Sequence, residues 1–267
     1  MQALAITGGK GGVGKTNVAV NLSVALAKLG KDVVLFDADL GLANVDLLMG
    51  LAVEYTLADV VSGRRNLSEI VVEGESGVRV IPAASGIPEM VNLAAGERAE
   101  IIKSCSEQIA TPDILVVDIG AGIDQTVQTF VAACHTPVLV VCDEPASLTD
   151  CYALIKVLRH SKNIKNFNVL VNQVDSSLQG TKVFERLSSV ANKHLDVGLN
   201  YLGCVPTDPY LKRAVQERRV LVNAYPRSPA ALSLSSCADK LSKLSAKDPS
   251  SGIAFFLDSL LETFPAA

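Results

Sequence analysis

The stretch Gly8-Gly9-Lys10-Gly11-Gly12-Val13-Gly14-Lys15-Thr16 decides the fold of this chain. Read from Gly9, it fits the pattern G-x-x-x-x-G-K-[ST], which is the phosphate-binding loop of nucleoside triphosphatases. The apolar run at residues 3–7 is long enough for a buried strand, and apolar residues recur after the loop at helical spacing. The sequence therefore places the loop between a strand and a helix, which is the context that this motif requires.

The residue types in this loop suit a bound triphosphate. Glycine has no Cβ, so the backbone can curl until successive N–H groups point at one anion. The N-terminus of the following helix adds a partial positive charge. We expect Lys15 to reach the β- and γ-phosphates and the Thr16 hydroxyl to ligate Mg²⁺. The predicted nucleotide-binding residues of this segment are Gly9, Lys10, Gly11, Gly12, Val13, Gly14, Lys15, Thr16 and Asn17.

Composition favours a single globular α/β protein. The chain has 267 residues, of which 49% are hydrophobic, and this is ample for one core. Its net charge of −4 disfavours a general nucleic-acid-binding surface, so direct DNA binding is not expected. The alternative is that a local basic patch at residues 209–219 contacts DNA. No pair of cysteines forms C-x-x-C, so no zinc or redox site is indicated. Met1 leads almost directly into the first strand, which predicts a cytoplasmic protein without a secretory signal.

Near-continuous apolar runs alternate with helical segments along the chain. Such runs are typical of parallel strands that are buried on both faces. We therefore predict a doubly wound, mostly parallel sheet with helices on both faces, in one domain at residues 1–246. Helices are predicted at residues 57–61, 97–110 and 229–246. A further helix is predicted from about Ser147, which would cap it, to residue 161. After the first strand, the predicted strands are residues 33–37, 78–81, 114–118, 138–142, 169–172 and 201–205.

Two of these strands lead to acidic residues with an expected role. Asp118 ends an apolar run, as in the second acidic motif of phosphate-loop proteins, and we expect it to hold Mg²⁺ through a water. Asp39 follows another strand, and its carboxylate could orient a water for in-line attack, with a solvated loop as the alternative. A guanine-specific protein would more often show N-K-x-D, whereas Gln173 follows Asn172 here, and this favours ATP.

The early lysine makes the loop read K-G-G-V-G-K-T from Lys10, which resembles the deviant phosphate loop of the MinD/ParA ATPases. The resemblance covers nearly the whole chain and is greatest to the flagellar-number regulators of the FlhG/FleN type. It is carried by residues 7–18, 37–46, 81–86 and 142–145. It implies that Lys10 crosses a dimer interface to the partner subunit's nucleotide. The catalytic residues would then be Lys10, Lys15 and Asp39, and the metal-site residues Thr16, Asp39 and Asp118.

The same resemblance assigns further contacts with the nucleotide. Asn172 stands at the adenine-reading position of the family, where its amide can both donate and accept. Backbone groups around Pro206 and Asp208 would flank the purine. Many relatives have Thr or Ser where Asn17 stands, so the contact with the α-phosphate is expected to differ here.

The end of the chain reads as a linker at residues 247–252 and an amphipathic helix at 253–264. MinD-like proteins often end in a membrane-targeting helix, so Ile253–Phe264 could make a reversible membrane contact. The only charges in this segment are Asp258 and Glu262, whereas interfacial helices usually carry Lys or Arg. Docking on the domain itself and binding in a partner's groove are the alternatives.

The expected function is an ATP-dependent dimerising switch with slow hydrolysis that regulates the number and placement of polar flagella. By resemblance, its partners would be an SRP-type GTPase (FlhF), a transcription activator of the FlrA/FleQ type and a flagellar switch-complex protein. The alternatives are a division-site or partitioning ATPase, a metabolic ATP-dependent ligase on the same fold, and a protein that holds nucleotide without hydrolysing it.

Overall fold

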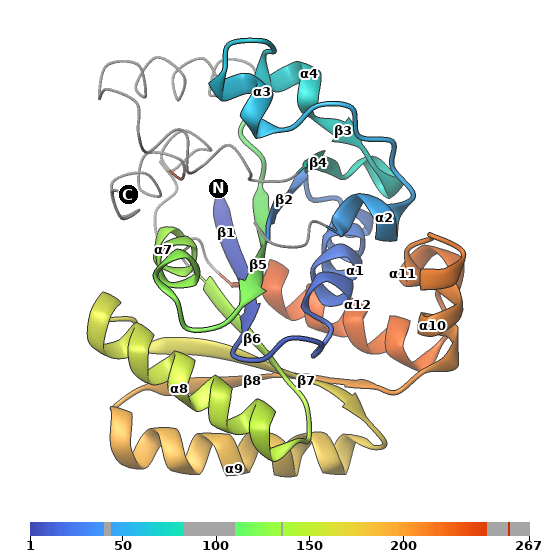
Figure 1. The fold of residues 1–267 in the computed structure, drawn as a ribbon. Helices are drawn as coiled ribbons and strands as arrows, with labels where there is room; N and C mark the ends of the chain where they lie inside the picture. The colour runs from blue at the N-terminus through green and yellow to red at the C-terminus, as the bar shows by residue number, and fades with distance from the viewer. Residues whose placement is uncertain (40–43, 83–109, 135, 245–255, 257–267) are drawn as a thin grey trace.

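A computed structural model describes residues 1–39, 44–82, 110–134, 136–244 and 256 of the chain. Its centre is an eight-stranded sheet with the strand order β3-β4-β2-β5-β1-β6-β7-β8 (Figure 1). All neighbouring strands are parallel except β3 and β4. The strands are β1 (Gln2–Gly8), β2 (Val33–Ala38), β3 (Val72–Glu73), β4 (Arg79–Ile81), β5 (Ile114–Ala121), β6 (Thr136–Val141), β7 (Asn166–Val174) and β8 (Gly198–Pro206). This architecture confirms the predicted doubly wound α/β fold.

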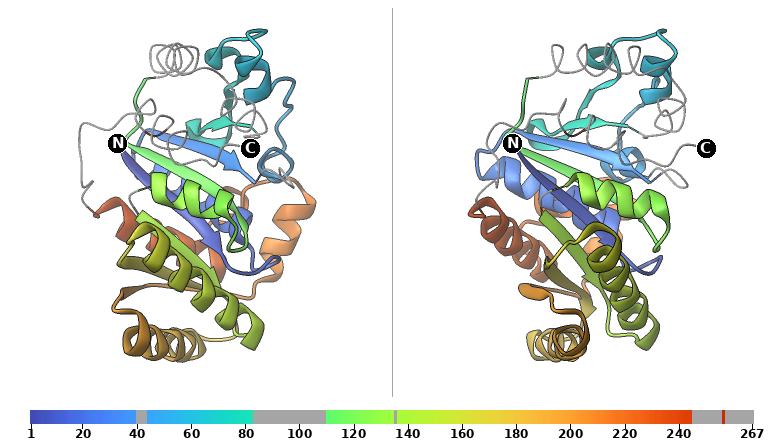
Figure 2. Two further views of the ribbon diagram at one scale, coloured as in Figure 1. Left: turned by 60° about the vertical axis from the view of Figure 1, so that its left-hand side comes forward. Right: turned by 90° about the vertical axis from the view of Figure 1, so that its left-hand side faces the viewer.

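Helices cover both faces of the sheet (Figures 1 and 2). One core lies under α3, α4, α7, α8 and α9, and a second lies under α1, α2, α10, α11 and α12. The helices are α1 (Lys15–Lys28), α2 (Val45–Met49), α3 (Leu57–Val61), α4 (Leu67–Ile70), α7 (Gln125–Ala133), α8 (Pro145–Lys162), α9 (Ser177–Leu195), α10 (Pro209–Gln216), α11 (Leu221–Ala224) and α12 (Pro229–Ser242), with a short 3-10 turn, η1, at Glu75–Gly77.

The central strand β1 explains why the apolar runs predict the sheet. All of its residues are buried, because β5 and β6 flank it in the sheet and helices cover both faces. The same double burial applies to most of β5 and β6. Parallel pairing brings the carboxyl ends of these strands to one edge, and the loops that follow β1, β2 and β5 meet there.

The predicted helix at residues 57–61 is confirmed, but the predicted start of α8 is wrong. Glu144 is the N-cap residue of α8, and Pro145 occupies its first turn. Ser147 lies inside the helix, where its Oγ accepts a hydrogen bond from the Cys142 N–H at 3.0 Å. The serine therefore fastens the end of β6 to α8 and does not cap the helix.

Several predictions fall outside the described residues: the helix at 97–110 except Ala110, the last two residues of the helix at 229–246, the linker at 247–252, residues 40–43 and 83–86 of the family segments, and the C-terminal helix except Phe256. Phe256 is buried, and its ring meets the Phe36 ring edge-on, with centroids 6.0 Å apart. Within the described parts of the chain, no helix is both long and apolar enough to span a membrane.

Candidate nucleotide-binding site

The phosphate loop connects β1 to α1 at the carboxyl edge of the sheet (Figure 1). Gly12 and Gly14 have φ values of 81° and 88°, in the left-handed region that favours glycine. A Cβ on Gly14 would lie 2.5 Å from the Asn172 amide nitrogen, and one on Gly9 would lie 2.3 Å from the Asp150 carbonyl oxygen. These glycines are therefore required by the close packing of the loop against β7 and α8.

Lys15 and the uncapped N-terminus of α1 lie together at the end of the phosphate loop. Lys15 is the first residue of α1, and its N-cap residue, Gly14, has no side chain to satisfy the N–H groups of the first turn. Lys15 is 8% exposed, and this burial lowers the pKa of its ammonium, while the carboxylates of Asp118 and Asp39 raise it. A phosphate at this helix end would meet both the buried cation and the N–H groups.

Asp118 and Thr16 have the chemistry of a magnesium site. Asp118 is 1% exposed, and among the described residues its Oδ1 has no hydrogen-bond partner. Burial raises the pKa of Asp118 to about 7, and a hydrogen bond with the Thr16 side chain opposes that rise. A bound cation would stabilise the charged form of a buried carboxylate that has an unsatisfied oxygen. Mg²⁺ fits this chemistry, with Thr16 and Asp118 as candidate contacts, and the third predicted metal-site residue, Asp39, lines the same cavity as Thr16.

The metal site would be complete only with a nucleotide bound. Within the described residues, no group of three or more His, Cys, Asp and Glu side chains could hold a metal ion. Mg²⁺ is often bound by only one or two protein groups together with phosphate oxygens and waters. The pair Thr16 and Asp118 is therefore sufficient only when a nucleotide supplies the remaining ligands.

Asp37 positions the predicted catalytic residue Asp39. The Asp37 carboxylate accepts hydrogen bonds from the N–H groups of Asp39, at 3.2 Å, and of Val45, at 3.3 Å. It lies opposite Asp118 in the register of β2 and β5, and burial raises its pKa to about 6. Asp39 reaches the end of β5, because a Cβ on Gly120 would lie 3.4 Å from the Asp39 Oδ1. Asp37 has no predicted role, although the D-x-D spacing places both carboxylates on one side of the strand.

A cavity of about 750 Å³ opens above the phosphate loop. Its volume is within the usual range for small-ligand sites. The lining comes from the loop and the start of α1, from Asp39 and Asn44, from the end of β5, from α2, and from α10 with the turn that follows it. These residues are Gly11, Gly12, Gly14, Lys15, Thr16, Asn17, Asp39, Asn44, Leu47, Leu48, Ala121, Val215 and Arg218.

Lys10 lies outside this cavity, on the exposed side of the loop. Its ammonium makes an ion pair with Glu144, which holds the pKa of the lysine above its usual value. In this structure Lys10 is therefore bound within its own chain. Such an exposed ion pair is weak and can exchange for a stronger anion.

The residues predicted to contact the base make hydrogen bonds within the protein. The Asn172 Nδ2 donates to the carbonyl oxygen of Val13 at 2.8 Å. The Asp208 carboxylate accepts from the N–H groups of Tyr210 and Ala230, both at 2.9 Å, and so ties α10 to α12. Neither residue lines the cavity, and neither does Pro206. The Asn172 Oδ1 could still accept from an adenine amine, so the base contact stays a prediction.

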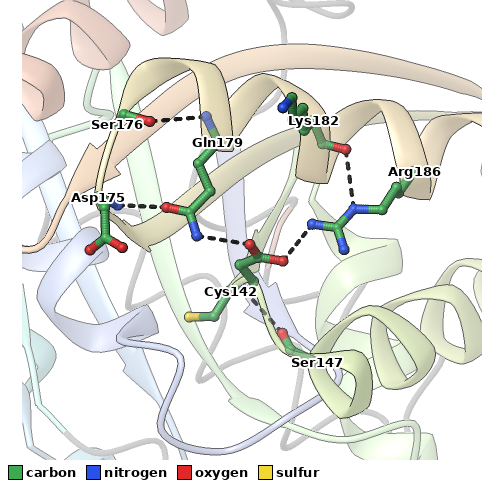
Figure 3. A network of polar contacts seen from close by, with 8 residues as sticks. Cys142, Ser147, Asp175, Ser176, Gln179, Lys182 and Arg186 are labelled. Atoms are coloured by element: carbon green, nitrogen blue, oxygen red, sulfur yellow. Dashed lines mark hydrogen bonds and ion pairs between the residues drawn. The ribbon is translucent and has the colours of Figure 1, made fainter.

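A polar network supports the segment that carries Glu144 (Figure 3). The Asp143 carboxylate binds the Arg186 guanidinium and accepts from the Gln179 Nε2 at 2.8 Å. The Gln179 Oε1 in turn accepts from the Asp175 N–H at 2.7 Å. These contacts link the end of β6 to α9 and to the end of β7, so they fix the position from which Glu144 holds Lys10.

Replacing Asp118 with Asn should separate metal binding from nucleotide binding. In the presence of Mg²⁺ we expect the Kd for ATP to rise on the order of tenfold, which is typical when a metal-site carboxylate contact is lost. In EDTA the Kd should match that of the wild type, because the amide keeps the volume of the side chain. Titration calorimetry with and without Mg²⁺ measures both values. An equal loss in the two conditions would exclude the metal role.

Comparisons with known proteins agree with this geometry. Residues 4–222 match the family model of the CobQ/CobB/MinD/ParA nucleotide binding domain. The chain is 46% identical over 263 residues to the antiactivator FleN of Pseudomonas aeruginosa, covering 98% of this chain and 94% of that protein. It is 35% identical over 264 residues to the flagellum site-determining protein YlxH of Helicobacter pylori, covering 97% of this chain and 89% of that protein.

A solved structure extends the likeness to a bound nucleotide. The septum site-determining protein MinD of Pyrococcus horikoshii, complexed with Mg-ADP, matches with a TM-score of 0.73 and 25% identity, covering 91% of this chain and 96% of that one. The phosphate loop, the Asp118 site and the fold thus agree with the family match. This chain belongs to the CobQ/CobB/MinD/ParA family of nucleotide-binding domains and is a MinD/ParA-type ATPase whose cofactors are ATP and Mg²⁺.

Proposed function

We propose that this protein is an ATP-dependent dimerising switch that regulates the number and placement of polar flagella. The observation that carries the proposal is the 46% identity with the antiactivator FleN over 98% of this chain. The flagellum site-determining protein YlxH supports the same role at 35% identity. The septum site-determining protein MinD of Bacillus subtilis is less similar, at 31% over 80% of the chain, so a flagellar role is favoured over division-site selection.

The loop after β5 would couple the nucleotide to the shape of the protein. The Gly122 N–H donates to the Gly8 carbonyl oxygen at 3.3 Å, and the Thr7 hydroxyl donates to the Gly120 carbonyl oxygen at 3.3 Å. Residues 120–122 are thus fastened to the start of the phosphate loop and lie beside Asp39. Loss of the γ-phosphate can release such a loop and thereby reopen a dimer.

The proposed partners are those of the flagellar branch: an SRP-type GTPase of the FlhF type, an activator of the FlrA/FleQ type, and a flagellar switch-complex protein. We place the protein in the cytoplasm. The buried Phe256 supports docking of the C-terminal segment on the domain in this state. Membrane contact at the inner face or the cell pole would then belong to another state of the same switch.

Deleting the gene in its native host should change the number of flagella per cell. An antiactivator restrains its target, so we expect more flagella in electron micrographs. The wild-type gene should restore the normal number, whereas Lys15→Ala should not, because this variant loses the buried cation of the nucleotide site. Normal flagellation together with minicells would instead assign the protein to division-site selection.

A further inference from the structure

The end of α10 differs in one residue from two other helix ends of this protein. Helices α1, α3 and α10 all end in the same motif, in which the second residue after the helix is left-handed and two N–H groups bond back to the last turn. Glycine fills that position in two of them, Gly30 with φ 82° and Gly63 with φ 71°. In α10 the same position holds Arg218, with φ 52°.

The hydrogen bonds show that the three ends are equivalent. In α10 the Arg218 N–H donates to the Val215 carbonyl oxygen at 3.1 Å, and the Arg219 N–H donates to that of Ala214 at 3.0 Å. The matching bonds after Gly30 and Gly63 have similar lengths. A side chain at this position costs stability relative to glycine. An arginine kept in a strained conformation therefore suggests a role for the guanidinium.

The backbone that carries Arg218 is fixed from both sides. A Cβ on Gly50, at the end of α2, would lie 2.9 Å from the Arg218 carbonyl oxygen, so α2 packs directly on this turn. The Glu75 carboxylate accepts from the Val220 N–H at 2.9 Å and from the Asn223 Nδ2 at 2.6 Å. The turn thus has a defined position, and only the side chain of Arg218 is left to adapt to a ligand.

That side chain lines the nucleotide cavity. Arg218 shares the lining with Asn17, which follows the metal-site threonine on α1, and with Leu47 and Val215, two exposed apolar side chains from α2 and α10. Within the described residues, no hydrogen bond or ion pair involves the Arg218 guanidinium. The nearby Arg213 is different, because its guanidinium is paired with Glu217 at 2.9 Å.

We propose that Arg218 binds the nucleotide of its own chain by donating to the phosphates nearest the adenosine. The motif predicts that Lys15 meets the β- and γ-phosphates, and the family resemblance implies that Asn17 lies beside the α-phosphate; both residues line the cavity. Asn17 brings no charge to that side, whereas an arginine offers a fork of N–H donors that matches phosphate oxygens. This inference concerns the ATP site itself and does not depend on the flagellar role.

The test compares Arg218→Ala with Arg219→Ala, which removes the same charge one residue away from the cavity. Titration calorimetry with ATP and with ADP, both with Mg²⁺, gives the affinities. We expect Arg218→Ala to raise the Kd about tenfold for both nucleotides, as for one charge-assisted contact. Arg219→Ala should change either Kd less than twofold. An unchanged affinity in Arg218→Ala, an equal loss in Arg219→Ala, or a loss for ATP alone would overturn the proposal.

Arg218→Gly separates binding from folding. Glycine suits the left-handed position, as Gly30 and Gly63 show, so the Tm without nucleotide should be at least as high as that of the wild type. The Kd for ATP and ADP should nevertheless rise about tenfold. A lower Tm that accompanies the loss of affinity would mean that Arg218 only holds the turn together, and this would also overturn the proposal.

Discussion

Lys10→Ala is expected to abolish both ATP-dependent dimerisation and ATP hydrolysis while ATP binding to the monomer persists. Lys10 lies on the exposed side of the phosphate loop and outside the cavity that we expect to hold the nucleotide of its own chain. Its Glu144 partner is also exposed, so a more highly charged anion can displace it. The triphosphate of a second subunit is such an anion. The loss of one cation acting in trans typically lowers kcat on the order of 10³-fold.

Light scattering with ADP and with ATP plus Mg²⁺ measures this effect for the wild type, Lys10→Ala and a control, Lys193→Ala, which removes a lysine near the end of α9. We expect a dimer with ATP in the wild type and in the control, and a monomer throughout in Lys10→Ala. A dimer of the Lys10 variant would show that the lysine does not act across the interface. A monomeric wild type in every condition would exclude the dimer mechanism altogether.

The sheet and the phosphate loop were predictable because double burial leaves long apolar runs. Residues 114–118 and 138–142 mark β5 and β6 on this ground alone, and the structure extends these strands by only a few residues. Helices α7 and α9 were predicted only as unspecified helical segments between apolar runs. The short helices α2, α4 and α11 and the edge strand β3 were missed. They contain only two to five residues, which is too short for a periodic pattern to emerge.

The site residues that the sequence does not predict owe their roles to contacts between segments that are distant in the chain. The motif spacing identified Lys15, Thr16 and Asp118, because a phosphate loop and a strand-ending aspartate each carry a local signal. Asp37 gains its role because its carboxylate accepts hydrogen bonds from the N–H groups of Asp39 and Val45, and because β2 places it opposite the distant Asp118 on β5. Arg218 reaches the cavity only because Gly50 and Glu75 hold its turn in place. No sequence pattern within residues 209–219 indicates that Gly50 or Glu75 lies beside this turn.

Asp39→Ala is expected to stop hydrolysis while ATP-driven dimerisation is preserved. The Asp39 carboxylate lines the cavity, and the Asp37 carboxylate holds its backbone at the end of β2. A carboxylate in this position can orient a water for in-line attack on the γ-phosphate. The loss of such a proton-accepting group typically lowers the rate by 10²- to 10⁴-fold, so we expect hydrolysis to fall by about 10³-fold. Lys15 and the proposed metal site, which we expect to hold the triphosphate, stay intact.

If Asp39 positions the attacking water, Asp39→Ala must lower ATP hydrolysis and leave ATP-driven dimerisation intact. Phosphate release under saturating ATP should fall to background, while light scattering with ATP plus Mg²⁺ should show a dimer that persists, since nothing reopens it. Asp175→Ala, which removes an exposed carboxylate at the end of β7, is the control and should hydrolyse at the wild-type rate. Hydrolysis at the normal rate in Asp39→Ala would remove this residue from the reaction. Loss of the dimer would instead place Asp39 in nucleotide-driven closure, because γ-phosphate sensing and water positioning would then depend on the same carboxylate.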